Sequence, residues 1–194
     1  MGSFIVLEGL DGVGKSTLAH GLARTLEATL MSTPGTEFAT LRGEVLRGLQ
    51  NDQLGKALFY AATVSFQGRK AIEKVRHGGT VVMDRYWAST VAYAKARGVT
   101  ADLDALTPGL VEPYITILIT LDEDQRVTRL KQRGATAEDI ETLCPTFRAS
   151  VMQELTARCS TSVDVTNLDK QEATAKVIEA IARVSSGETA QQSK

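Results

Sequence analysis

The sequence predicts an α/β protein in which helices cover both faces of a five-stranded parallel sheet. Two patterns carry this prediction. Five short apolar or β-branched runs alternate with longer segments of helical periodicity. A glycine-rich stretch also joins the first apolar run to the first helical segment. Because the carboxyl ends of parallel strands form one edge of such a sheet, we expect the functional residues directly after the strands.

The predicted elements follow one another along nearly the whole chain. The first strand is a continuous apolar run, Phe4 to Leu7, as in a buried parallel strand. Leu18, Leu22 and Leu26 then repeat at helical spacing. The predicted strands are residues 4–8, 29–32, 80–84, 115–121 and 161–166. The predicted helices are residues 15–28, 37–50, 54–77, 86–97, 123–133, 137–158 and 169–186. We expect one domain over residues 1–186 and a disordered polar tail over 187–194.

The composition of the chain disfavours several classes of protein. The chain is 43% hydrophobic and 23% charged, with a formal net charge of −1 and no dense basic run, so a nucleic-acid polymer is not expected as a partner. No apolar run is long enough to span a membrane, and no basic region precedes the first one, so we expect a cytoplasmic protein. Cys144 and Cys159 lack zinc-site spacing and are expected to be reduced thiols.

The stretch GLDGVGKST, residues 9–17, has the spacing of a phosphate-binding loop. Its fixed positions are Gly9, Gly14, Lys15 and Ser16, and it lies between a predicted strand and a predicted helix. In that setting the backbone N–H groups and the helix dipole attract an anion. Lys15 can reach the β- and γ-phosphates of ATP, and the Ser16 hydroxyl can bind Mg²⁺.

A second polar motif, MDRYWASTVAY at residues 83–93, follows the third predicted strand. Asp84 could hold Mg²⁺ through water or accept a proton, and Arg85 could clamp a second phosphate group. The alternative is a structural ion pair within the fold. Asp122, at the end of another strand, could contribute to the site or cap the helix that begins at Glu123.

These motifs resemble those of thymidylate kinases. The resemblance rests on four stretches in order, FIVLEGLDGVGKST, LFYAATVSF (58–66), VVMDRYWASTVAY (81–93) and LITLDEDQRVTRLKQRG (118–134), and it runs from residue 4 to about 158. It implies the P-loop NTPase fold of nucleoside monophosphate kinases, a homodimer, and transfer of the γ-phosphoryl group of MgATP to dTMP or a related nucleotide.

The resemblance also implies roles for individual residues. The loop would bind ATP through Gly9, Asp11, Gly12, Gly14, Lys15, Ser16 and Thr17. Asp11 would approach the acceptor sugar, Phe59 would stack on the base, and Arg85 would bind the acceptor phosphate. Asp84 would join Ser16 at the metal. The acceptor pocket would also include Thr63, Ser89 and Tyr93.

Three polar residues of the family pattern are absent. The arginine after the second strand, the base-reading arginine and a glutamine are replaced by Ser32, Thr63 and Ala94. Because each charged hydrogen bond is worth roughly 1.5–3 kcal/mol, we expect dTMP to be a poorer acceptor than at least one other nucleotide.

The resemblance further implies a lid at about residues 133–145 with an arginine that acts on the transferred phosphoryl group. The loop itself contains no arginine. Arg133, beside Gly134 at the expected lid turn, is the first candidate, and Arg129 and Arg148 are the others. The predicted catalytic residues are therefore Lys15, Asp84, Arg85 and Arg133.

Other functions fit parts of the sequence. A kinase of another small phosphorylated metabolite agrees with the missing acceptor contacts. A P-loop regulatory ATPase would need mobile loops and a water-positioning residue instead of an acceptor pocket. An inactive relative is disfavoured because Lys15, Ser16, Asp84 and Arg85 are all present.

Overall fold

A computed structural model describes residues 2–134 and 136–186 as an α/β domain built on one sheet of five parallel strands. The strand order is β2-β3-β1-β4-β5. The strands are β1 (Phe4–Glu8), β2 (Thr29–Ser32), β3 (Val81–Asp84), β4 (Ile115–Thr120) and β5 (Thr161–Asp164). The predicted strands and the fold class are confirmed. The predicted tail, residues 187–194, lies outside the described residues.

Helices connect the strands in the way that parallel pairing requires. They are α1 (Lys15–Thr25), α2 (Ala39–Leu49), α3 (Gln53–Arg76), α4 (Trp87–Ala96), α5 (Glu123–Arg133), α6 (Ala137–Glu141), α7 (Pro145–Arg158) and α8 (Lys170–Ser185). Two 3₁₀ segments are η1 (Thr36–Phe38) and η2 (Leu103–Gly109). The sequence did not predict η2. None of these helices combines the length and apolar character that crossing a bilayer requires.

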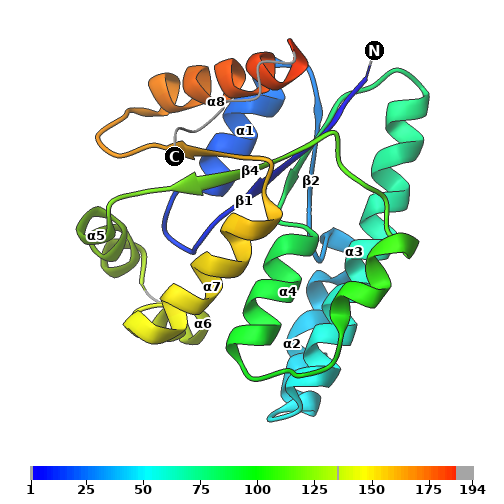
Figure 1. Ribbon diagram of the computed structural model, residues 1–194, viewed down its shortest axis with the longest axis vertical. Helices are drawn as coiled ribbons and strands as arrows, with labels where there is room; N and C mark the ends of the chain where they lie inside the picture. The colour runs from blue at the N-terminus through cyan, green and yellow to red at the C-terminus, as the bar shows by residue number, and fades with distance from the viewer. Residues whose placement is uncertain (1, 135, 187–194) are drawn as a thin grey trace.

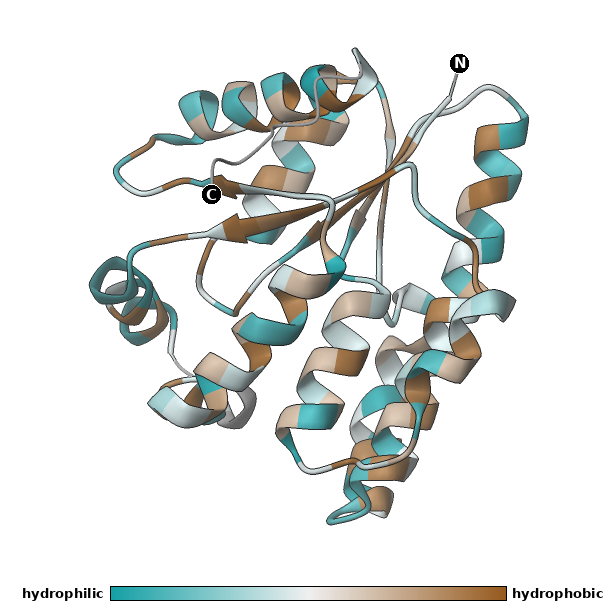
Figure 2. Cartoon of the chain, viewed as in Figure 1, coloured by the Kyte–Doolittle hydropathy of each residue, from teal (hydrophilic) through white to brown (hydrophobic). Residues whose placement is uncertain are grey.

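The sheet separates two layers of helices. Helices α1 and α8 lie on one face, and α3, α4 and α7 lie on the other (Figure 1). Side chains of β1 alternate between the layers, because Ile5 and Leu7 join the cluster around α1 while Phe4 and Val6 join the cluster around α3. The central strands β1, β3 and β4 are mostly apolar, while the outer helix surfaces carry many hydrophilic residues (Figure 2).

The predicted helix over residues 137–158 is wrong in one respect, because two helices occupy this stretch. Pro145 is the first residue of α7, and the preceding Cys144 is extended, with φ −67 and ψ 119. Proline lacks the N–H that a helix interior needs and disfavours helical geometry in the residue before it. The segment that was expected to form a lid therefore contains a short helix, α6, which ends before α7 begins at Pro145.

Candidate active site

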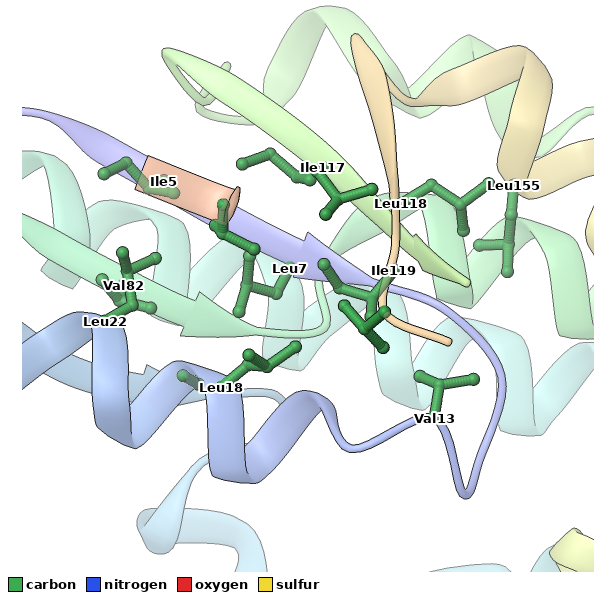
Figure 3. Close-up of a cluster of buried hydrophobic side chains, with 14 of the residues drawn as sticks. Ile5, Leu7, Val13, Leu18, Leu22, Val82, Ile117, Leu118, Ile119 and Leu155 are labelled. Atoms are coloured by element: carbon green, nitrogen blue, oxygen red, sulfur yellow. The ribbon is translucent and has the colours of Figure 1, made fainter. Parts of the chain in front are cut away.

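The phosphate loop is anchored to the hydrophobic core at the carboxyl end of β1. Leu10 and Val13 are 5% and 2% exposed, and Figure 3 shows Val13 among the buried side chains around Ile119. Gly9, Gly12 and Gly14 of the loop all have a positive φ. Gly9 has φ +146, and a Cβ there would lie 2.5 Å from the Ile119 carbonyl oxygen. Gly14, at φ +97, caps α1 in a conformation that other residues rarely adopt.

Lys15 lies within this loop, and its side chain is folded back along it. The ammonium donates a 2.7 Å hydrogen bond to the Leu10 carbonyl oxygen, and the residue is 6% exposed. Burial, reinforced by the positive charge of Arg85, lowers the pKa of Lys15 to about 8. A bound anion beside Lys15 would stabilise its charged form, which burial disfavours.

Ser16 and Asp84 meet across the loop, as the sequence predicts. The Ser16 hydroxyl donates to Asp84 Oδ2 over 2.6 Å. This contact arises because Asp84 ends β3, which pairs with β1 in parallel register, Leu7 opposite Asp84. The second carboxylate oxygen, Asp84 Oδ1, is buried with no hydrogen-bond partner among the described residues. Two oxygen ligands at a loop that binds phosphate form a suitable cradle for a hard divalent cation.

Arg85 connects the phosphate loop to the neighbouring cavity. Its Nη2 donates to Asp11 Oδ1 over 2.7 Å, and its Nη1 donates to Ser89 Oγ over 2.9 Å. Arg85 has φ +66, a left-handed conformation that is uncommon for a side chain of this size. The Arg85 N–H donates to the Leu7 carbonyl oxygen and the Thr33 hydroxyl donates to the Arg85 carbonyl oxygen, both over 2.9 Å, and these bonds hold it there. Such strain is typical of functional positions.

Asp11 and Tyr93 complete the polar contacts of this arginine. The Tyr93 hydroxyl donates to Asp11 Oδ2 over 3.1 Å. Burial alone would raise the pKa of Asp11, but the charges of Arg85 and Lys15 outweigh it and hold this pKa well below its usual range. Burial raises the pKa of Tyr93 to about 12, so the phenol keeps its proton as a donor.

A buried carboxylate that the sequence analysis overlooked supports the cluster from behind. Glu8, fully buried at the end of β1, accepts hydrogen bonds from the backbone N–H groups of Tyr86 and Ser89, at 2.9 and 3.2 Å. It also accepts a hydrogen bond from the Ser89 hydroxyl. Burial raises the pKa of Glu8. A charged residue that ends an otherwise apolar strand, directly before the loop, was the signal available in the sequence.

A cavity of about 540 Å³ opens beside Arg85, between the segment 32–36 and helices α2, α3 and α4. This volume suits a small-molecule ligand. Among the residues that the sequence singled out, it is lined by Asp11, Ser32, Arg85, Ser89, Tyr93 and Ala94. Polar residues that the sequence analysis did not identify also line it, namely Arg42, Gln53, Lys56, Tyr60 and Arg97.

The structure does not bring Phe59 and Thr63 into this cavity. The α3 residues that line it, from Gln53 to Tyr60, recur every three or four positions and so share one helix face. Phe59 lies beside that face and packs edge-to-face against Phe38, with ring centroids 6.4 Å apart. Thr63 is fully buried, and its hydroxyl donates to the Tyr60 carbonyl oxygen over 2.8 Å. Tyr60, the next residue along α3, lines the cavity instead.

The lid arginines also differ from expectation. Arg133, with 52% of its side chain exposed, pairs with Asp139 of α6 at 2.6 Å, so it connects α5 to α6. Arg129 instead reaches the phosphate loop, where its Nη1 donates to the Val13 carbonyl oxygen over 3.3 Å. Arg148 pairs with Glu123 at 3.1 Å. Asp122 caps α5 by accepting from the N–H groups of Asp124 and Gln125.

Arg126, which the sequence analysis did not identify, connects Thr142, after α6, to the phosphate loop. It is fully buried and pairs with Glu123 at 2.8 Å. Its Nη1 donates to the Asp11 carbonyl oxygen over 2.9 Å and to Thr142 Oγ1 over 3.0 Å. Its signal in the sequence was a charged residue four positions before Leu130, on the buried stripe of α5.

The parallel sheet carries a phosphate loop, a serine–aspartate pair beside that loop and a cavity built around an arginine. Together these features define a P-loop phosphotransferase with two adjacent substrate sites. This is the arrangement of a nucleoside monophosphate kinase.

Comparison with known proteins gives the family. The model of the thymidylate kinase family matches residues 7–178, and the chain belongs to that family. A probable thymidylate kinase of Pyrobaculum aerophilum is 34% identical over 146 residues, which cover 73% of this chain and 76% of the relative. One from Pyrococcus abyssi is 32% identical over 151 residues, with 71% and 74% covered.

Solved structures share the fold. The thymidylate kinase of Candida albicans superposes with a TM-score of 0.75 at 22% identity, and the match covers 95% of this chain and 92% of that one. The enzyme from Ehrlichia chaffeensis gives 0.69 at 23% identity, with 93% and 98% covered. The chain is thus an ATP-dependent nucleoside monophosphate kinase, and the comparisons give no support to a regulatory ATPase or to a kinase of an unrelated metabolite.

Proposed function

We propose that this kinase transfers the γ-phosphoryl group of ATP to dTMP, with the cavity beside Arg85 as the acceptor site. The ion pair between Asp11 and Arg85 carries this proposal, because it joins the donor loop to the acceptor cavity at a distance of 2.7 Å. An acceptor phosphate held by Arg85 then lies next to the loop that holds the donor phosphates. That proximity is the main requirement of in-line phosphoryl transfer.

The expectation of weak dTMP turnover rested on the loss of three polar side chains. Other donors in the cavity, Arg42, Lys56 and Arg97, support replacement of those contacts from different positions. The names of the relatives, probable thymidylate kinases, support dTMP as the acceptor. An acceptor phosphate is already ionised at neutral pH, so the reaction needs no strong general base.

On the donor side, Lys15 and Arg129 would supply positive charge to the γ-phosphoryl group. Arg129 is our choice for the lid arginine because its guanidinium is 3.3 Å from the Val13 carbonyl oxygen of the loop, whereas Arg133 is paired with Asp139. Positive groups placed before the reaction stabilise the charge that develops in the transition state.

Ser16 and Asp84 would hold Mg²⁺. The unpartnered Asp84 Oδ1 and the Ser16 hydroxyl are oxygen ligands of the kind that Mg²⁺ prefers. When bound, the metal neutralises charge on the β- and γ-phosphates. Asp84 acts as a metal ligand in this scheme and takes no proton.

The protein would act as a cytoplasmic homodimer. An exposed apolar stripe supports self-association, since Leu54, Leu58 and Phe66 recur along α3 and are 42%, 50% and 36% exposed. Leu58→Glu is expected to convert a dimer to a monomer in light scattering. Leu106→Glu is the matched control, because Leu106 is 42% exposed and lies on η2 instead.

The direct test is ADP release from MgATP with dTMP, compared with EDTA-treated enzyme and with Lys15→Ala. The proposal expects turnover that is saturable in dTMP, is lost without metal and is lost in the variant while the fold is retained. Activity of Lys15→Ala within tenfold of wild type would contradict the loop assignment. Turnover that does not depend on dTMP would contradict the acceptor.

A further inference from the structure

The acceptor cavity extends well beyond the arginine that would hold the phosphate. On one side, Ser89, Tyr93 and Arg97 are spaced four residues apart along α4 and its C-terminal cap, and they line about 12 Å of the cavity. On the other side, Gln53 and Tyr60 line two turns of α3. With the phosphate at Arg85, the base of a nucleotide would lie in the part farther from the loop.

Arg42, Gln53 and Tyr60 are polar residues that all line this cavity. Arg42, from α2, donates a 3.1 Å hydrogen bond through Nε to the Tyr60 hydroxyl, and both residues line the cavity. Gln53 Oε1 is buried without a hydrogen-bond partner among the described residues, and Gln53 lines the same cavity. A buried acceptor without a partner is unfavourable, and a ligand N–H would satisfy it.

Arg42 and Gln53 line the cavity, whereas Phe59 and Thr63 are not among its lining residues. Thr63 is fully buried, and its hydroxyl already donates a hydrogen bond to the Tyr60 carbonyl oxygen. Phe59 packs against Phe38 outside the cavity lining. Neither residue offers a polar group to a base. Among the polar residues that line the cavity, Arg42 lies on α2 and Gln53 lies in the first turn of α3.

We propose that Arg42 and Gln53 are the residues of this chain that contact the lactam edge of the acceptor base, a ring N–H beside a carbonyl oxygen. Arginine is a donor only, so it suits a carbonyl oxygen, and Gln53 Oε1 suits the ring N–H. Uracil and thymine present this edge. Cytosine presents an amino group and an unprotonated nitrogen there, which oppose both residues. This inference rests on the proposed function, because it places a nucleoside monophosphate in this cavity.

The sharpest comparison is dUMP with dCMP, two substrates of nearly the same size that differ at this edge. Wild-type enzyme is expected to show a kcat/KM ratio of at least about 30 in favour of dUMP. Arg42→Ala should lower kcat/KM for dUMP about 10- to 100-fold and leave dCMP within about threefold. Arg47→Ala is the matched control, since Arg47 is an exposed arginine of the same helix that does not line the cavity. It should change neither substrate.

Gln53→Leu provides a second variant that does not depend on the stability of Arg42→Ala. It should also reduce the dUMP preference, by about tenfold, through loss of dUMP turnover. Equal losses for both nucleotides in the two variants, or a wild-type ratio near 1, would overturn the inference while dTMP turnover leaves the proposed function intact. Absence of turnover with every monophosphate would instead overturn the proposed function.

Discussion

The ammonium of Lys15 donates its 2.7 Å hydrogen bond to the carbonyl oxygen of Leu10, five residues earlier in the same loop. The lysine therefore stays against the loop backbone, and burial keeps its pKa near 8. In the function proposed above, Lys15 contacts the ATP phosphates in its charged form. The free enzyme should thus lose affinity for ATP when Lys15 loses its proton.

The first prediction is a decline in kcat/KM for ATP at alkaline pH. Because the pKa of Lys15 in the free enzyme is lowered to about 8, the ammonium form is present below pH 8 and is lost above it. We expect kcat/KM for ATP to fall roughly 30-fold between pH 7 and pH 9.5. With saturating ATP, kcat/KM for the acceptor should stay nearly constant over this range, because bound phosphates keep Lys15 charged. A flat ATP profile would contradict the prediction.

The second prediction separates the two lid arginines. Arg129→Ala is expected to lower kcat at least about 100-fold, because it removes a cation beside the phosphate loop. Arg133→Ala breaks a half-exposed ion pair with Asp139, so kcat should stay within about threefold. Steady-state rates at saturating substrates measure both effects. A larger loss in Arg133→Ala would return the lid role to Arg133, where the sequence first suggested it.

The third prediction concerns Glu8, which acts on the acceptor site through Ser89. Glu8→Gln presents an amide NH₂ to Ser89 Oγ, which already accepts from Arg85. We expect KM for the acceptor to rise about tenfold while kcat/KM for ATP changes little. Ser89→Ala should raise the same KM, and the double variant should show no additive loss. Additive losses would mean that Glu8 does not act through Ser89.

The fourth prediction concerns Thr63→Arg, a substitution that the family pattern suggests but the structure disfavours. An arginine at position 63 would restore the family pattern, but Thr63 is fully buried. Thr63→Arg is therefore expected to lower the free energy of unfolding by about 3 kcal/mol or more, measured in urea, without improving dTMP turnover. Thr63→Ser, which keeps the hydroxyl, is the control. A stable variant with higher dTMP activity would show that this position reaches the base.

The sequence was sufficient to predict the features that follow from local sequence patterns or from the geometry of parallel sheets. The spacing from Gly9 to Ser16, together with the strand before it, predicts the phosphate loop. The rule that parallel strands end at one edge brings Asp84 to Ser16. Asp122 and Pro145 likewise mark the start of α5 and α7 through local chemistry.

The sequence did not predict the features that depend on helix rotation or on tertiary packing. Successive residues on a helix point about 100° apart, so the packing of Phe59 against Phe38 determines that Tyr60 faces the cavity. Whether Arg129 or Arg133 contacts the phosphate loop depends on the position of α6 relative to α5, because Arg133 pairs with Asp139 of α6. Arg126 was overlooked because a charged residue is expected at a surface, whereas its buried guanidinium has partners from three parts of the chain.

The ion pair between Asp11 and Arg85 also limits how this kinase could be redesigned or could diverge. Asp11 belongs to the loop that serves the donor, yet its side chain forms part of the acceptor cavity. A change made there to admit a new acceptor would therefore alter the use of ATP as well. Arg42 and Gln53 lie on α2 and α3, outside that loop. Substitutions in these two helices could therefore change the substrate range without changing the residues of the phosphate loop.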